Sequence, residues 1–126
     1  MPSFGIRKPT TSRYDEVLQK PPDLLKAEGF GVLTQVDVKD TLKQKLGVEF
    51  RRYMILGACN PPLAHRALTA ELEIGVMLPC NVIVYEGDDG KAVVVAIDPM
   101  QTVAGANAEL APVAREVRER LTRVLE

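Results

Sequence analysis

The segment at positions 57–65, which reads Gly-Ala-Cys-Asn-Pro-Pro-Leu-Ala-His, combines the residue types most capable of chemistry in this chain. It places Cys59, one of two cysteines, at the expected end of a strand and directly before an expected helix start. The only histidine, His65, lies one turn inside that helix. A helix N-terminus presents partial positive charge and unpaired N–H groups, which favour a thiolate. The segment is therefore the first candidate site.

One hypothesis makes Cys59 the nucleophile of a thiol-dependent enzyme, or a sulfur carrier, with His65 assisting it. These two residues are then the candidate catalytic residues. If Pro61 is the first helical residue, His65 is the fifth, which tends to carry it round the helix and away from the thiol. The sequence also assigns no Asp or Asn to orient the imidazole.

A second hypothesis makes Cys59, His65 and Cys80 the ligands of a metal or a haem, since all three side chains are competent ligands. Their spacing of six and then fifteen residues matches no common zinc pattern, and no CxxC or CxxCH occurs. The site would have three ligands and an open position. A third hypothesis treats both cysteines as small buried hydrophobes and His65 as a surface residue, and residue statistics favour it.

Composition predicts a single domain over residues 1–126 with its own core, because 46% of the residues are hydrophobic. Sixteen basic residues against 17 acidic ones leave a net charge of −1, and tryptophan is absent. Nucleic-acid binders usually show a basic excess and base-stacking aromatics, so no nucleic-acid partner is expected. The basic group at Lys39, Lys43 and Lys45 is interpreted as a solvated helix face.

The chain is expected to be cytoplasmic. Positions 1–10 show no apolar run after their charges, so no secretory signal is predicted. No stretch approaches the roughly 20 apolar residues that cross a bilayer, so no membrane partner is expected. Two cysteines do not make a disulfide scaffold, and free thiols suit a reducing compartment.

Hydrophobic periodicity and turn residues predict the first half of the fold. An edge strand is expected at 3–8, followed by a helix that Pro21 and Pro22 break and that ends at Gly29. The segment 30–38 carries apolar residues on both faces, which predicts a central strand. A short helix then starts at Asp37 or Asp40 and stops at Gly47. Its buried face is expected to carry Leu42 and Leu46.

The second half is predicted with clearer boundaries. A strand at 52–59 leads into a helix capped by Asn60, with Pro61 first and an end near Ala70. A hairpin pairs 80–86 with 91–97. The last helix starts near 108–111 and carries one apolar stripe, which comprises Leu110, Val113, Val117, Leu121 and Val124. The predicted fold class is α+β, with a mixed sheet of about five strands and helices packed against it.

Several segments in order resemble one known family. They are GFGVLT at 29–34, YMILGACNPPLA at 53–64 and LPCNV at 78–82. The chain resembles the bacterial and archaeal family called domain of unknown function 302, from about residue 28 to the end. The resemblance implies a compact α/β domain of this length that forms homodimers. The family's activity is not established, so the resemblance identifies no reaction, and the cofactor remains unknown.

The resemblance directs attention to the two signature segments. Their repeated Cys-Asn pair implies two strand ends that meet at one pocket. The candidate ligand-binding residues are Cys59, Asn60, His65, Cys80 and Asn81. The leading hypothesis is a small-ligand-binding or regulatory domain with a pocket near Cys59 and Cys80. Its expected partners are a small molecule and a second copy of the chain, with which it would form a homodimer. The thiol enzyme and the metal or haem binder are the alternatives.

Overall fold

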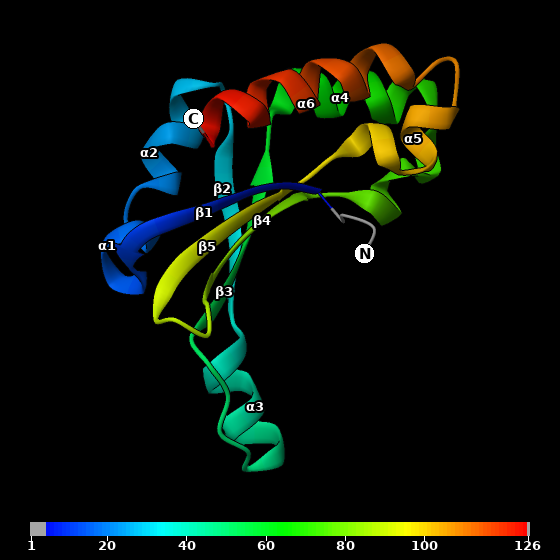
Figure 1. The fold of residues 1–126 in the computed structure, drawn as a ribbon. Helices are drawn as coiled ribbons and strands as arrows, with labels where there is room; N and C mark the ends of the chain where they lie inside the picture. The colour runs from blue at the N-terminus through cyan, green and yellow to red at the C-terminus, as the bar shows by residue number, and fades with distance from the viewer. Residues whose placement is uncertain (1–4, 126) are drawn as a thin grey trace.

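The computed structural model describes residues 5–125 and contains a five-stranded sheet with helices on one face (Figure 1). The strands are β1 (Gly5–Arg13), β2 (Gly31–Asp37), β3 (Tyr53–Cys59), β4 (Cys80–Glu86) and β5 (Lys91–Ile97). Their order across the sheet is β1-β5-β4-β3-β2. The α+β class is confirmed.

The predicted mixed sheet is wrong in one respect, because all neighbouring strands within residues 5–125 are antiparallel. The reason lies in the connection between β3 and β4. Ala58 at the end of β3 pairs with Cys80 at the start of β4. The intervening helices therefore return the chain to the end of the sheet that it had just left, and no crossover of the kind that parallel strands need is made.

The helices keep the breaks that the prolines predicted. They are α1 (Tyr14–Leu18), α2 (Pro21–Ala27), α3 (Val38–Leu46), α4 (Pro61–Ala70), α5 (Val103–Ala106) and α6 (Ala111–Val124), with 3-10 turns η1 (Leu72–Met77) and η2 (Pro99–Gln101). Pro21 opens α2, so the predicted broken helix is confirmed as two short helices. Proline fits a first turn because its missing N–H would be unpaired there anyway.

Side-chain caps and one left-handed glycine set the ends of α3 and α4. The Asp37 carboxylate accepts a hydrogen bond from the Asp40 N–H at 3.0 Å, and Asn60 Oδ1 accepts one from the Leu63 N–H at 3.3 Å. Gly47 ends α3 with a φ of 68°, a conformation that only glycine adopts without strain. Each of these ends was predicted from the residue type.

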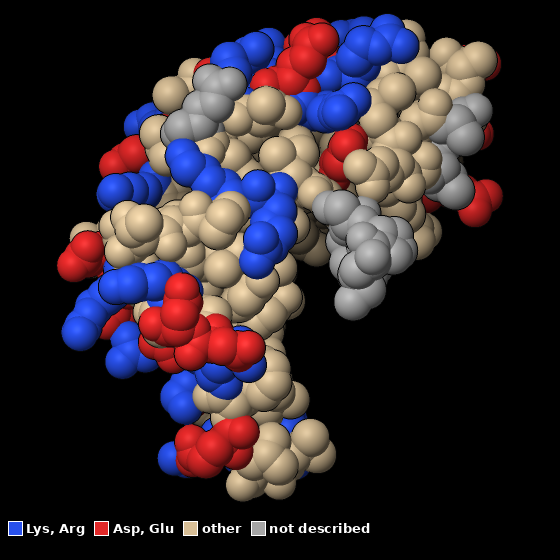
Figure 2. Space-filling model, in the orientation of Figure 1, with Lys and Arg blue, Asp and Glu red and all other residues tan. Residues whose placement is uncertain are grey.

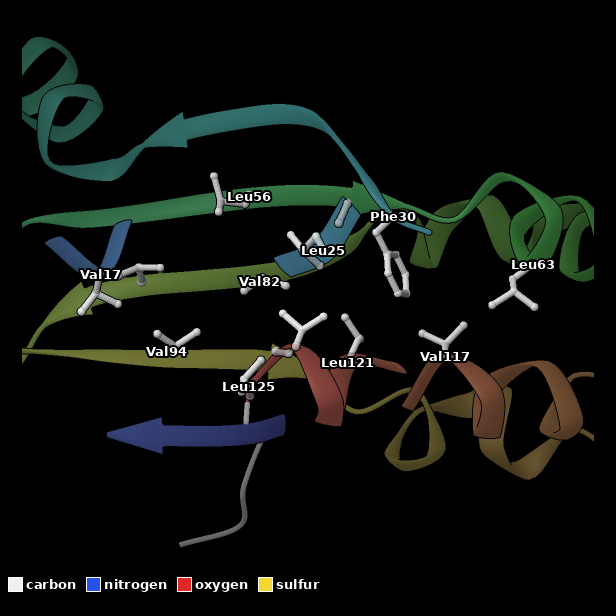
Figure 3. Close-up of a cluster of buried hydrophobic side chains, with 14 of the residues drawn as sticks. Val17, Leu25, Phe30, Leu56, Leu63, Val82, Val94, Val117, Leu121 and Leu125 are labelled. Atoms are coloured by element: carbon white, nitrogen blue, oxygen red, sulfur yellow. The ribbon is translucent and has the colours of Figure 1, made fainter. Parts of the chain in front are cut away.

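The core lies between one face of the sheet and α6. Alternate residues of the central strands, Leu56, Val82 and Val84, point to this face and are buried. The stripe predicted on the last helix is buried throughout: Leu110, Val113, Val117, Leu121 and Val124. Figure 3 shows Val82 of β4 and Val117 and Leu121 of α6 in the space between the sheet and the helix. The alternating apolar residues of the strands and the apolar stripe of α6 therefore pack together in one layer between the sheet and the helix.

Among residues 5–125 no helix lies on the opposite face of the sheet, which we call the bare face, and an arm made of the end of β2, α3 and the start of β3 extends beyond one end of the sheet (Figure 1). Strand β2 is an edge strand with mostly exposed residues, so its predicted central position is wrong. The predicted burial of Leu46 is also wrong, since it is 69% exposed. The two errors have different causes: within residues 5–125 no strand pairs with the outer side of β2, and α3 lies beyond the helices that cover the sheet (Figure 1).

Candidate functional site

The antiparallel pairing of β3 and β4 brings the two cysteines to one end of the sheet. Cys59 follows Ala58, whose partner across the strands is Cys80. Both thiols are free and half-buried. Both residues line one small cavity under α4 and α6. The geometry thus matches the sequence inference that the two Cys-Asn segments meet at one place.

This cavity consists of two adjoining hollows of about 50 and 60 Å³. Cys80 borders both of them, whereas Cys59 borders only the smaller. Four further residues line both hollows: Ala67, Leu78, Val113 and Val117. The walls therefore come from α4, α6, the end of η1 and the start of β4. We call the two hollows together the Cys80 cavity.

Burial makes the Cys80 thiol harder to ionise. Loss of water around the sulfur raises the pKa of Cys80 to about 11, and the nearby Cys59 acts in the same direction. At neutral pH the thiol is therefore protonated. A protonated thiol is a poor nucleophile and a poor metal ligand. Cys80 supplies an apolar, weakly polar wall instead of a reactive group.

The structure does not bring His65 to the thiols. The side chain is exposed on α4 and lines neither hollow. Within residues 5–125 no group of three His, Cys, Asp or Glu side chains lies close enough to hold a metal ion. The proposed three-ligand site of Cys59, His65 and Cys80 is therefore wrong, because successive turns of α4 carry His65 to the solvent side.

Asn60 borders the smaller hollow but has a structural task. Besides capping α4, its Nδ2 donates to the Glu28 carbonyl at 3.4 Å. Arg120 of α6 donates to the same carbonyl at 2.8 Å. Gly29, at a φ of 87°, leaves the space in which Asn60 and Arg120 reach that carbonyl. Asn60 thus ties the end of α2 to α4 and α6.

Asn81 lies outside the cavity. Successive residues of a strand point to opposite faces, so Asn81 faces away from Cys80. It pairs with Gly57 of β3 and is exposed. Of the five residues predicted to bind a ligand, the structure brings Cys59, Asn60 and Cys80 to the cavity and leaves His65 and Asn81 outside it.

Sequence reasoning missed most of the cavity wall. Val113 and Val117 were predicted as core residues of the last helix, and Ala67 as part of the helix after Asn60. A core position and a cavity wall carry the same apolar residue types, so no sequence signal separates them. The difference depends on how closely α4, α6 and the strand ends approach one another.

The fold and the cavity define a class of small α+β domain: an antiparallel sheet, helices on one face, and two free cysteines at the strand ends. The model of the family described as domain of unknown function DUF302 matches residues 6–126. The chain belongs to this family. The described helices include none long and apolar enough to span a membrane.

A solved structure supports the assignment. The chain is 31% identical to an uncharacterized conserved DUF302 protein from Bacillus stearothermophilus, known from a crystal structure. The two folds superpose with a TM-score of 0.88 over 98% of this chain and 97% of the other. No curated protein matches the chain. The comparisons therefore establish the family and the fold and name no reaction.

Proposed function

We propose that this protein is a small-ligand-binding domain whose ligand occupies the Cys80 cavity. The observation that carries the proposal is the lining of the two hollows, which is almost wholly apolar and includes the uncharged Cys80 thiol. Apolar cavities in proteins stay dry and accept small apolar guests, whereas polar cavities hold water. The ligand class is therefore a small apolar molecule, or the apolar end of a larger one.

The volume of the cavity limits the ligand. A cavity of about 150 Å³ accepts benzene, and each hollow here is well under half that size. Only a guest of a few atoms enters without movement. Met77 and Ile74 of η1 form part of the larger hollow. Since Met77 is partly exposed and its side chain is flexible, its displacement is the route for a larger apolar guest.

The thiol-enzyme alternative has less support. That hypothesis makes Cys59 the nucleophile with His65 assisting it, but His65 is exposed on α4 and does not line the hollow that Cys59 borders. A catalytic thiol needs a nearby base or a stabilised thiolate. The binding hypothesis requires neither.

Xenon tests the proposal directly, because it is apolar and fits a small hollow. We expect saturable chemical-shift changes at the methyl groups of Val113, Val117 and Ile74 when xenon is dissolved under pressure. Ala67→Val adds carbon to the wall that both hollows share, so it should abolish those changes while the protein stays folded. Absence of a saturable response in the wild type would contradict the proposal.

A matched control uses Ala27→Val. Ala27 is exposed on α2, and the substitution carries the same cost for a β-branched residue in a helix. This variant should bind xenon as the wild type does. If Ala67→Val also bound xenon unchanged, the guest would lie elsewhere and the assignment to the Cys80 cavity would be wrong.

The assembly we propose is a homodimer formed through the bare face of the sheet. Ile55 and Ile83 pair across β3 and β4, point to that face by strand alternation and are partly exposed. Among residues 5–125 no helix lies on this face (Figure 1). Tyr53 and Tyr85 stack on the same face with ring centroids 5.6 Å apart. Extended apolar surfaces of this kind usually mark an interface, and a face that pairs with its own copy closes as a twofold dimer.

Sedimentation analysis tests the dimer. Ile83→Glu should convert the protein to a monomer, because two copies of the new charge would meet near a twofold axis. Leu72→Glu, which adds the same charge at a side chain 82% exposed in η1, should leave the dimer intact. A wild-type protein that sediments as a monomer at micromolar concentration would contradict this assembly.

A further inference from the structure

We propose a second binding site, in a cleft between β1, α2 and the C-terminal end of α6, that takes an anionic amphiphile. Such a ligand has an apolar body and a carboxylate or phosphate head. The cleft has a volume of about 390 Å³ and shares no lining residue with the Cys80 cavity. Its size falls in the range of roughly 300–1,000 Å³ that small-molecule sites occupy. We call it the β1 cleft.

The floor of the β1 cleft is apolar and comes from four parts of the chain. Val17 of α1 and Val94 of β5 point toward each other, and Leu125 follows the end of α6 beside them (Figure 3). Leu24 of α2 also lines the cleft and is 42% exposed. An alkyl chain laid along this floor would remove the exposed part of Leu24 from water, which is favourable in proportion to the area covered.

The rim of the β1 cleft is cationic. Lys8 extends from β1 and Lys20 from the turn before α2, and both are exposed. The described lining residues include no carboxylate. Figure 2 shows lysine and arginine side chains over this side of the molecule with uncharged surface between them. Two ammonium groups above an apolar floor favour a ligand whose negative head stays at the mouth.

An irregularity in β1 shapes the mouth of the cleft. Pro9 pairs with Val93 and Arg13 with Lys91, so residues 10–12 stand opposite a single residue of β5, Ala92. The Thr10 hydroxyl donates to the Ala92 carbonyl at 2.7 Å and holds the bulge in place. Bulges recur at sheet edges beside binding sites, where they redirect side chains. Here the three residues of the bulge, Thr10, Thr11 and Ser12, line the cleft.

Octyl phosphate and octanoate, each below its micelle-forming concentration, are the probes for this site. We expect saturable shifts at the methyl groups of Val17, Leu24 and Val94. The methyl groups of Val113 and Ile74 should stay unchanged, which separates this site from the Cys80 cavity. Octanol should bind at least fivefold more weakly, about the effect of one ion pair, and inorganic phosphate alone should not saturate.

Two lysine variants test the charge. Lys8→Gln and Lys20→Gln should each weaken octyl phosphate about fivefold at low salt, and the double variant should bind it no better than octanol. Lys26→Gln is the matched control, since Lys26 is an exposed lysine of α2 outside the cleft. It should bind as the wild type does.

The outcomes decide between occupants. Absence of saturable shifts at the cleft overturns the proposal, as does octanol that binds as tightly as octyl phosphate. Binding to vesicles of anionic phospholipid without binding of the single-chain probes would also overturn it, because the cationic rim would then contact a membrane surface instead of holding one molecule. Failure of this test leaves the xenon experiment on the Cys80 cavity unaffected.

Discussion

The two faces of the sheet differ in what covers them, and this difference separates stability from recognition. On the helix-covered face, Leu56 and Val82 are almost fully buried against α6. On the other face, Ile55 and Ile83 lie one residue along the same strands and remain partly exposed. Neighbouring residues of the same apolar type thus serve the core on one side and, as we propose, a partner on the other.

The largest effect should come from the covered face. Leu121→Ala removes a side chain with no exposed surface, and the cavity it leaves should lower the free energy of unfolding by about 2–5 kcal/mol. Leu46→Ala on the arm, where the side chain is 69% exposed, should change it by less than about 0.5 kcal/mol. Urea unfolding of both variants measures the contrast. Equal losses would mean that the arm is covered in solution.

A smaller effect is expected at high pH. The pKa of Cys80 rises from 9.0 to about 11 on folding, so the unfolded chain loses this proton first. The free energy of unfolding should therefore fall as pH rises from 9 to 11, by an amount on the order of 2 kcal/mol for this group.

Urea titrations between pH 9 and 11 test this effect when the pH dependence of the unfolding free energy is compared between the wild type and cysteine variants. The decline should be flatter in Cys80→Ala than in the wild type, whatever the starting stability of the variant. Cys59→Ala should keep most of the wild-type slope. Identical slopes in all three proteins would show that the Cys80 thiol meets water in the folded state.

The next largest loss of stability is expected from removing the cap of α4. Asn60→Ala removes the acceptor for the Leu63 N–H and the donor to the Glu28 carbonyl. We expect a loss of about 1–2 kcal/mol in the free energy of unfolding, typical of a lost cap. Asn60→Asp, which keeps the acceptor, should recover part of the loss. A variant as stable as the wild type would argue against the structural task of Asn60.

The smallest effect should come from the arm. Glu49 forms ion pairs with Lys39 and Lys43 at 3.4 and 3.2 Å, and these two contacts hold the pKa of its carboxyl below the usual value. Because all three side chains are well exposed, water and salt screen the pairs. Glu49→Gln should leave the urea midpoint unchanged. A clear loss would indicate that a partner shields the arm.

Several elements could be predicted because their signals are local. The cap at Asn60, the proline after it and the hairpin between β4 and β5 depend on residues within a few positions of one another. The apolar stripe of α6 was also readable, since helical periodicity identifies its buried face. Strand β2 could not be placed in the same way. Its residues suit a central strand, and only the absence of a neighbour on its outer side makes it an edge.

The residues of the candidate site were likewise predictable where the signal is local and not where it depends on packing. Cys59 and Cys80 were singled out by residue type, and their meeting was inferred from the repeated Cys-Asn pair. His65 and Asn81 lie outside the cavity because the His65 side chain is on the solvent side of α4 and the Asn81 side chain is on the face of β4 opposite to Cys80. The β1 cleft was not foreseen, because Val94 and Leu125 of its floor lie far in sequence from the segment 8–24 that supplies its lysines.

The amino-acid sequence alone determined the helix boundaries near prolines, caps and glycines, the hairpin, the α+β class and the family. The local elements follow from backbone preferences and short-range periodicity, which act over a few residues, whereas the family was identified from the resemblance of the segments around Cys59 and Cys80. Only the tertiary structure decided the strand order, the bare face, the raised pKa of the Cys80 thiol and the two hollows. Burial and cavities arise where distant segments pack, and the energy of that packing belongs to the assembled fold and to no single stretch of sequence.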